Sequence, residues 1–354
     1  ISLTTSQGVS FMKHILLIAT GGTIASRPTE NGLAPQLLAD DILRCVPALG
    51  SLCRIDAVQP MNIDSTNMSP DCWLALADCL RAHYDQYDGF VIAHGTDTMA
   101  YTACALSYLV QQSGKPIVLT GAQKSIYVQD TDARRNLYDA FVAAQDDNLA
   151  GVYIVFDGRV ILGTRARKTR TKSMNAFSSI DYPDVALIRD GRILHYIRQP
   201  RPQTPPAFYG RLDASVFVLR LIPGMNPEVL RLLASRFDAL VIESFGVGGL
   251  PCYEQADFLS AAAAWSSAGK PIVITTQVPH EGSDLAVYQV GARAAAQPGI
   301  LQAYTMTVEA VVTKLMWILP QTRDLTEIKR LFYAPIACDL LQFEELGQEI
   351  DESH

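Results

Sequence analysis

Short apolar segments that end in glycine, threonine or aspartate recur along the chain, and they limit its fold more than any other feature. The first four are KHILLIAT (13–20), GFVIAHG (89–95), KPIVLTGA (115–122) and GVYIVFDG (151–158). Stretches with helical apolar spacing separate most of them, which is typical of a parallel sheet with crossover helices. The pattern resumes further on with SVFVLRLI, ALVIESFGVG and KPIVITTQ. We therefore expect an α/β protein of two domains, each with a mainly parallel sheet flanked by helices.

A proline-rich segment marks the expected domain boundary. Residues 199–213 (QPRPQTPPAFYGRLD) hold four prolines and a glycine, a composition that continues neither a helix nor a central strand. This places a larger domain at 13–198 and a smaller one at 214–354. Residues 1–12 are interpreted as an extension or a tag remnant, because ISLTTSQGVSF has neither the basic residues nor the apolar stretch of a signal peptide.

Charge and cysteine content narrow the class of protein. The formal net charge of -7 is not the basic surface that nucleic acid or an anionic membrane requires. No apolar run approaches the ~18 residues that cross a bilayer. The seven cysteines form no CxxC pair, which favours reduced thiols in a cytoplasmic protein over a metal site. We expect no metal, no cofactor, no nucleic acid and no membrane partner.

One helix has a clear start. In SPDCWLALADCLRAHY the sequence predicts Ser69 as the N-cap and Pro70 as the first helical residue.

Hydroxyl and acidic side chains follow the ends of the predicted strands. They are Thr23, Thr96, Asp97 and the run Asp64-Ser65-Thr66, together with the backbone of Gly95 and Gly121-Ala122. Ligands of open parallel sheets bind beyond the carboxyl ends of the strands, so these residues are expected to face one crevice. A glycine-threonine pair at a strand end is also a common turn with a hydroxyl cap, and either motif alone allows that interpretation.

Several enzyme classes are excluded by missing motifs. The chain has no GxxxxGK[ST] phosphate loop, and GGTIAS is not GxGxxG. There is no GxSxG elbow, and only His94 lies near a strand end, which disfavours a serine-histidine hydrolase.

The threonines need an activating group, since a threonine hydroxyl is a poor nucleophile at neutral pH. Asp97 is adjacent to Thr96, and the loop TRARKTRTK (164–172) is expected to bring a lysine to it. The other cations of this loop either belong to the site or form a solvated strip. The pair Arg134-Arg135 is interpreted as structural, pairing with Asp130, Asp132 or a helix end.

Four segments resemble one family closely. ATGGTIAS (19–26), MNIDSTNMSPDCWLALA (61–77), AHGTDTMAYTA (93–103) and LTGAQKSIYVQDTDARRNLYDAF (119–141) are similar to the bacterial L-asparaginases. The resemblance extends from about Met12 through the C-terminal domain, and the lack of a signal peptide points to the cytoplasmic type I branch.

The resemblance implies a catalytic set and a binding set. Thr23 would be the nucleophile, and Thr96, Asp97 and Lys168 would form a second catalytic group. The residues implied in substrate binding are Asp64, Ser65, Thr66, Gly95, Asp97 and Ala122. Within this set Ser65 would grip the α-carboxylate, Asp97 the ammonium group, and the Ala122 carbonyl would lie near the leaving amide.

The implied reaction converts L-asparagine to L-aspartate and ammonia, with L-glutamine as a further candidate substrate. An acyl-enzyme on Thr23 and direct attack by water both remain open. The implied assembly is a homodimer or a homotetramer. The alternative is a glutaminase-type, ammonia-releasing subunit of a tRNA-dependent amidotransferase, which the acidic charge disfavours.

The chain departs from the family pattern at three places. Leu33 stands where many members carry a tyrosine in a mobile loop, and Gly249 where many carry an asparagine that reaches a neighbouring subunit. Glu281 and Asp284 are the acidic candidates for such intersubunit help. Val278 replaces an effector-site cysteine, so regulation by asparagine is not expected.

Overall fold

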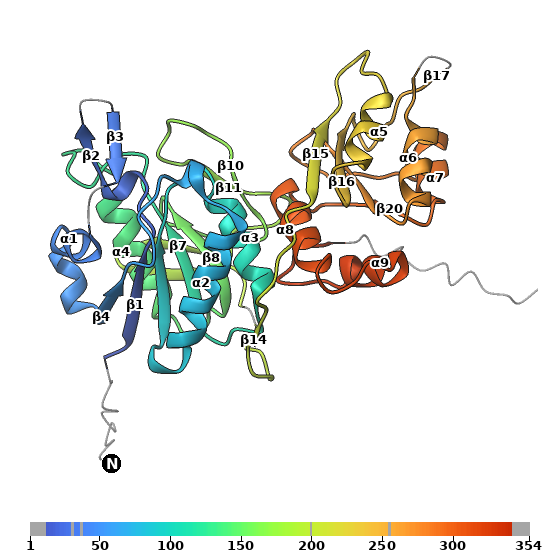
Figure 1. Cartoon of the computed structure of the whole chain (residues 1–354). Helices are drawn as coiled ribbons and strands as arrows, with labels where there is room; N and C mark the ends of the chain where they lie inside the picture. The colour runs from blue at the N-terminus through green and yellow to red at the C-terminus, as the bar shows by residue number, and fades with distance from the viewer. Residues whose placement is uncertain (1–11, 30–31, 36–37, 199, 254–255, 342–354) are drawn as a thin grey trace, which may run out of the picture.

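The computed structural model describes residues 12–29, 32–35, 38–198, 200–253 and 256–341. Two α/β units lie side by side, with helix α8 (Val308–Ile318) of the second unit between them (Figure 1). The predicted extension before residue 12 lies outside the described residues. No helix in the described ranges combines the length and the apolar character needed to span a membrane.

The larger sheet has eight strands, and its middle is parallel. In spatial order they are β13 (Arg192–His195), β12 (Ala186–Arg189), β9 (Arg159–Leu162), β8 (Gly151–Phe156), β7 (Pro116–Thr120), β5 (Gly89–Ala93), β1 (His14–Ala19) and β4 (Arg54–Val58). The five strands from β8 to β4 pair in parallel, and β9, β12 and β13 add antiparallel pairs at one side.

Both faces of this sheet are covered because its central strands are apolar on both sides. In β1, Ile15 and Leu17 join one buried cluster with helix α4 (Ala133–Ala144), while Leu16 and Ile18 join the other with helices α2 (Pro70–His83) and α3 (Met99–Leu109). Alternate side chains of a strand point to opposite faces, so a continuous apolar run needs a helical layer on each. The short helix α1 (Ala39–Arg44) joins the α4 side.

Helix α2 begins at Pro70, as its sequence predicts. Ser69 is the N-cap residue, as predicted, but its side chain makes no capping hydrogen bond and lies 3.4 Å from Cys72 Sγ.

The smaller sheet is wholly parallel. Its strands, in spatial order, are β15 (Val216–Arg220), β16 (Ala239–Ser244), β19 (Ile272–Thr276) and β20 (Ile300–Gln302). Helices α5 (Glu228–Ala234), α6 (Phe258–Ser267) and α7 (Gln289–Ala295) cover one face. Helices α8 and α9 (Leu325–Tyr333) cover the other, and this cluster also takes in Cys104 and Tyr108 of α3. The predicted fold class is thus confirmed.

Two-stranded pairs complete the chain. They are β2 (Ser26–Thr29) with β3 (Gly32–Pro35), β6 (Val110–Gln111) with β14 (Ala207–Phe208), β10 (Ala166–Lys168) with β11 (Phe177–Ser179), and β17 (Cys252–Tyr253) with β18 (Ala256–Asp257). The β6–β14 pair ties the proline-rich segment to the end of α3, so this segment is anchored to the first unit as well as connecting the two.

Candidate active site

Three central strands of the larger sheet end level with one another. Ala19 of β1 is in register with Ala93 of β5, and Ala93 with Thr120 of β7. Backbone hydrogen bonds continue from the strands into the loops that follow them. Thr20 N–H donates to Ala93 O (3.0 Å), and His94 N–H donates to Thr120 O (2.8 Å). The glycine-threonine motifs therefore leave the sheet side by side.

Glycines let these loops pack backbone against backbone. A Cβ on Gly22 would lie 2.4 Å from the Gly95 Cα, and one on Gly95 would lie 2.6 Å from Ser65 Oγ. Gly22 also has a φ of +76°, a region that L side chains avoid. Half-buried Thr23 directly follows this contact and begins a short 3₁₀ turn, Thr23–Ala25. The stretches that carry Thr23, Ser65 and Thr96 are thus in contact.

Gly22→Ala tests this packing. We expect a loss of roughly 2–4 kcal/mol in the free energy of unfolding, because the left-handed conformation and the clash with backbone each cost about 1–2 kcal/mol or more. Gly114→Ala is the matched control, since a Cβ there meets nothing within 4 Å. Thermal unfolding of both variants measures the difference, and equal midpoints would show that the loops are not tightly packed.

Lys168 joins the second threonine to its neighbouring aspartate. Its Nζ donates to Thr96 Oγ1 (2.8 Å) and to Asp97 Oδ1 (2.6 Å). Thr96 is buried, and Thr96 Oγ1 lies 3.4 Å from Gln123 Oε1. The lysine side chain is 16% exposed and that of Asp97 is 58% exposed, so one carboxylate oxygen remains open to a ligand. A positive amine beside a threonine oxygen lowers the cost of removing the hydroxyl proton.

The lysine lies on a strand and not, as expected, in a loop. It is the last residue of β10, in register with Phe177 of β11. The other cations of TRARKTRTK were interpreted either as site residues or as a solvated strip. Neither interpretation describes Arg165, which is fully buried.

The Asp64-Ser65-Thr66 run forms a 3₁₀ turn at Ser65–Asn67. Asp64 Oδ1 accepts from Thr66 N–H and from Thr66 Oγ1, both at 2.8 Å. Ser65 is 4% exposed, and its carbonyl accepts from Thr98 Oγ1 at 2.8 Å. The Thr98 bond fixes this turn to the loop of Thr96.

The loop after β7 is held by residues whose role the sequence did not reveal. Asp132 accepts from the backbone N–H of Gln123 (2.8 Å) and Lys124 (3.0 Å). Asn136 Nδ2 donates to Gly121 O at 3.0 Å. These bonds set the position of buried Ala122.

The expected partners of the arginine pair are wrong. Arg135 lies 3.5 Å from Asp139, and Arg134 donates to Ile126 O at 2.9 Å. Asp130 pairs with Lys124 instead. Asp132 directly precedes α4, but its carboxylate accepts from the backbone N–H groups of Gln123 and Lys124 and makes no capping hydrogen bond to the helix.

His94 is buried, and both of its ring nitrogens have hydrogen-bonding partners. Its Nδ1 lies 2.6 Å from Gly95 O, and its Nε2 lies 2.9 Å from Thr102 Oγ1. Complete burial lowers the pKa of His94 to about 4, so the ring is neutral near pH 7. This agrees with the absence of a serine-histidine motif.

The structure also places the residues that depart from the family pattern and the two acidic candidates for intersubunit contacts. Leu33 is in β3, in register with Pro28 of β2. Exposed Glu281 has a φ of +74°, and its N–H donates to Asp181 at 3.1 Å. Exposed Asp284 accepts from Ala286 N–H at 3.0 Å. Gly249 N–H donates to Phe245 O at 2.8 Å in a tight turn, and Val278 is exposed.

Among the described residues, no group of three or more histidine, cysteine, aspartate or glutamate side chains comes together in a way that could hold a metal ion.

Comparison with known proteins identifies both units. Residues 14–201 match the family model "Asparaginase, N-terminal", and residues 215–332 match "Glutaminase/Asparaginase C-terminal domain". An L-asparaginase of Thermococcus kodakarensis is 40% identical over 92% of this chain and 98% of its own. The solved structure of the thermostable L-asparaginase from the same organism superposes with a TM-score of 0.87 at 39% identity, covering 93% of this chain and 99% of that one.

Two further relatives are also similar to this chain. L-asparaginase 1 of Escherichia coli K12 is 33% identical over 90% of this chain and 95% of its own. A glutamyl-tRNA(Gln) amidotransferase component of Metallosphaera sedula is 31% identical over 90% of this chain and 74% of its own. With both family models matched in order along most of its length, the chain belongs to the asparaginase family.

Proposed function

We propose that the chain is an L-asparaginase, which hydrolyses the side-chain amide of free L-asparagine to L-aspartate and ammonia. The observation that carries this is the single lysine amine bonded to both Thr96 and Asp97 at the strand ends. The extended similarity to an L-asparaginase supports it.

A free amino acid is a zwitterion, and the site offers a partner for each of its charges. Asp97 is the anchor for the ammonium, because its second oxygen is left open by Lys168. The α-carboxylate meets the turn of Asp64, Ser65 and Thr66 together with the backbone of Gly95. Since Thr66 already donates to Asp64, Ser65 supplies the hydroxyl. These contacts hold the side-chain amide against Thr23, which turns a bimolecular attack into a nearly unimolecular one.

Thr23 is the nucleophile of the proposed reaction. Its Oγ1 forms a bond to the amide carbon, and its proton passes through Thr96 Oγ1 to the amine of Lys168, which accepts it in the neutral form. The tetrahedral intermediate collapses with transfer of a proton to the leaving nitrogen, beside the Ala122 carbonyl, and ammonia departs. Water then hydrolyses the Thr23 ester and releases aspartate. Direct attack by water, polarised by the two threonines, is the competing pathway, and mass spectrometry of the acid-quenched enzyme distinguishes the two by the mass of an aspartyl adduct on Thr23.

An amidotransferase role is the second candidate, since the glutamyl-tRNA(Gln) amidotransferase component of M. sedula is a relative. The net charge of -7 does not suit a tRNA-binding surface. Ammonia release from a free amino acid without tRNA separates the two functions.

The proposal also covers the domain bounds, the assembly and the cellular compartment. The domains are 13–198 and 214–354, with residues 199–213 as linker. The assembly is a homodimer or homotetramer, in which Glu281 or Asp284 of a neighbouring copy approaches the site. The seven cysteines are all free, which suits a reducing cytoplasmic compartment.

A steady-state ammonia assay on L-Asn, L-Gln and D-Asn tests the function. We expect turnover of L-Asn, turnover of L-Gln lower by about 10-fold or more, and none of D-Asn, since one methylene in a closed pocket is worth about 1–3 kcal/mol. No ammonia from L-Asn, or ammonia only when charged tRNA is supplied, would refute the assignment.

A further inference from the structure

Strand β10 sends its side chains alternately to the two units. Lys168 reaches Thr96 of the first unit, and Ala166 lies in the buried cluster of that unit. Arg165 and Arg167 contact residues of the second unit. Successive residues of a strand point to opposite faces, so Arg167 and Lys168 lie on opposite sides of β10, and Arg165 is the residue just before the strand.

Of the two arginines, Arg165 is bound more tightly to the second unit. Its side chain is fully buried, with Nε donating to Cys338 O at 2.6 Å and Nη1 to Thr305 O at 2.8 Å. The residue before it adds another bond, since Thr164 Oγ1 donates to Ala337 O at 2.7 Å. Three main-chain carbonyls of the second unit thus fix the start of β10.

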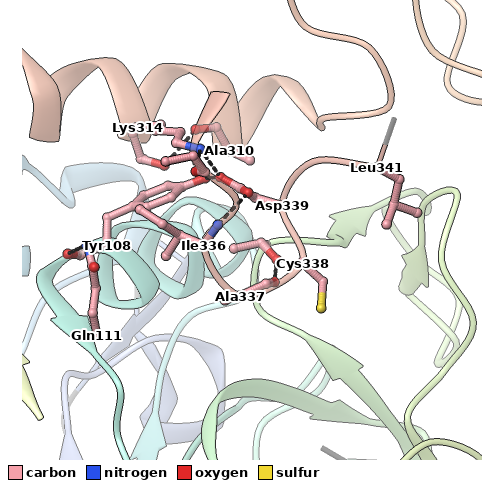
Figure 2. Close-up of polar contacts among 12 residues, drawn as sticks. Tyr108, Gln111, Ala310, Lys314, Ile336, Ala337, Cys338, Asp339 and Leu341 are labelled. Carbon is pink, nitrogen blue, oxygen red and sulfur yellow. Dashed lines mark hydrogen bonds and ion pairs between the residues drawn. The ribbon is translucent and has the colours of Figure 1, made fainter. Parts of the chain in front are cut away.

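Two of the carbonyls that receive these bonds belong to residues 334–341, which we call the seam segment. Ala337 and Cys338 have φ values of +50° and +55°. Asp339 holds the segment in this shape, accepting from Lys314 Nζ at 2.6 Å and from Tyr108 Oη at 2.9 Å, with both members of the ion pair fully buried (Figure 2). A buried pair that keeps its hydrogen bonds gives a rigid support.

The seam segment also supports helix α3, which follows Thr96 and Asp97, the two residues that bind the Lys168 amine. Tyr108 is in the last turn of α3, and α3 starts at Met99, two residues after Asp97. Both the strand with the lysine and the helix behind Thr96 and Asp97 therefore rest on the seam segment.

Arg167 adds a weaker attachment. Its Nε lies 3.7 Å from Glu309 Oε1, in the first turn of α8. This is an ion pair without hydrogen-bond geometry, and we assign the main role to Arg165.

We propose that Arg165 is a positioning residue for the reaction, which fastens β10 to the second unit and so holds the amine of Lys168 against Thr96 and Asp97. This rests on the proposed function. Arg165 itself points away from the reacting groups and acts only through the strand.

Arg165→Met removes the donors while keeping an unbranched side chain. We expect kcat for L-asparagine to fall about 30-fold with KM changed less than 3-fold, since a misplacement near 1 Å can cost 10²-fold in rate. Arg165→Lys keeps the charge and one donor position, and we expect it to recover kcat to within about 5–10-fold of the wild type. If the methionine variant does not fold, the lysine variant decides: a 5–10-fold lower kcat supports the proposal, and a wild-type kcat overturns it.

Lys115→Met is the matched control. The Lys115 amine also donates to two main-chain carbonyls, Tyr84 O (2.5 Å) and Tyr87 O (2.7 Å), but at the amino end of β7, whereas the site lies beyond the carboxyl ends of the strands. We expect its kcat to stay within 2-fold of the wild type while its thermal midpoint falls comparably to that of Arg165→Met. An equal drop in kcat in both variants would make the Arg165 effect one of stability and overturn the proposal.

A double-mutant cycle with Lys168→Met separates positioning from general damage. We expect Arg165→Met to cause no further loss of kcat once the lysine amine is gone, and a repeated 30-fold loss would refute the proposal. The failures are distinguishable: no ammonia from L-asparagine with the unmutated enzyme overturns the proposed function, wild-type activity of Lys168→Met removes the lysine from the mechanism and the positioning role with it, and an inactive Lys168→Met with a normal Arg165→Met overturns the positioning role alone.

Discussion

Thr23→Ala is expected to lower kcat for L-asparagine by about 10⁴-fold or more, because loss of a nucleophile removes the bond-forming step itself. The free energy of unfolding should change by less than about 1 kcal/mol, since the side chain is only half-buried and truncation leaves the neighbouring backbone contacts in place. Ammonia release and thermal unfolding measure the two quantities separately.

Two variants sharpen this test. Thr23→Ser keeps the hydroxyl, so we expect it to retain far more activity than Thr23→Ala and to form the same aspartyl ester. Thr204→Ala changes an exposed threonine of the linker and should leave kcat unaltered. A Thr23→Ala enzyme within 100-fold of wild type would show that water attacks the amide directly.

Lys168→Met is expected to lower kcat by about 10³-fold while the protein stays folded. Proton transfer by a positioned group contributes typically 10²–10⁴-fold, and the amine is bonded to both Thr96 and Asp97. The ion pair with Asp97 is largely solvent-exposed on the carboxylate side, and such pairs are worth at most about 1 kcal/mol in stability. Steady-state kinetics and a thermal melt check both statements.

The neighbouring cation Lys172 supplies the comparison. It is exposed, and Lys172→Met should behave as the wild type. Lys168→Arg should not restore activity, because the planar guanidinium cannot take the place of a compact amine between two oxygens. Wild-type turnover in Lys168→Met would remove the lysine from the mechanism.

Local sequence patterns were sufficient for the fold. Buried strands such as Ile15–Ala19 show themselves as continuous apolar runs, and parallel pairing then places their carboxyl ends at one edge. The level ending of β1, β5 and β7 follows from this, and with it the nearness of the two threonine motifs. The role of Lys168, by contrast, was predicted only through the family resemblance.

The supports of the site were not readable because they depend on contacts between distant segments. Asp132 looks like one acidic residue among several, and only the folded loop shows it accepting from the backbone of Gln123 and Lys124. Likewise, TRARKTRTK shows only a basic strip, although the fold buries Arg165 and brings Lys168, at the end of β10, to Thr96. Pairing with β11 sets Arg167 and Lys168 on opposite sides of β10.

The late position of the seam segment has a consequence for synthesis on the ribosome. A nascent chain that has reached residue 300 already contains every residue assigned to catalysis, yet the carbonyls of Ala337 and Cys338 that bind Thr164 and Arg165 have not been made. Full activity would thus begin only when translation is almost finished, and products that stop before residue 337 would have a lowered kcat even with an intact first unit.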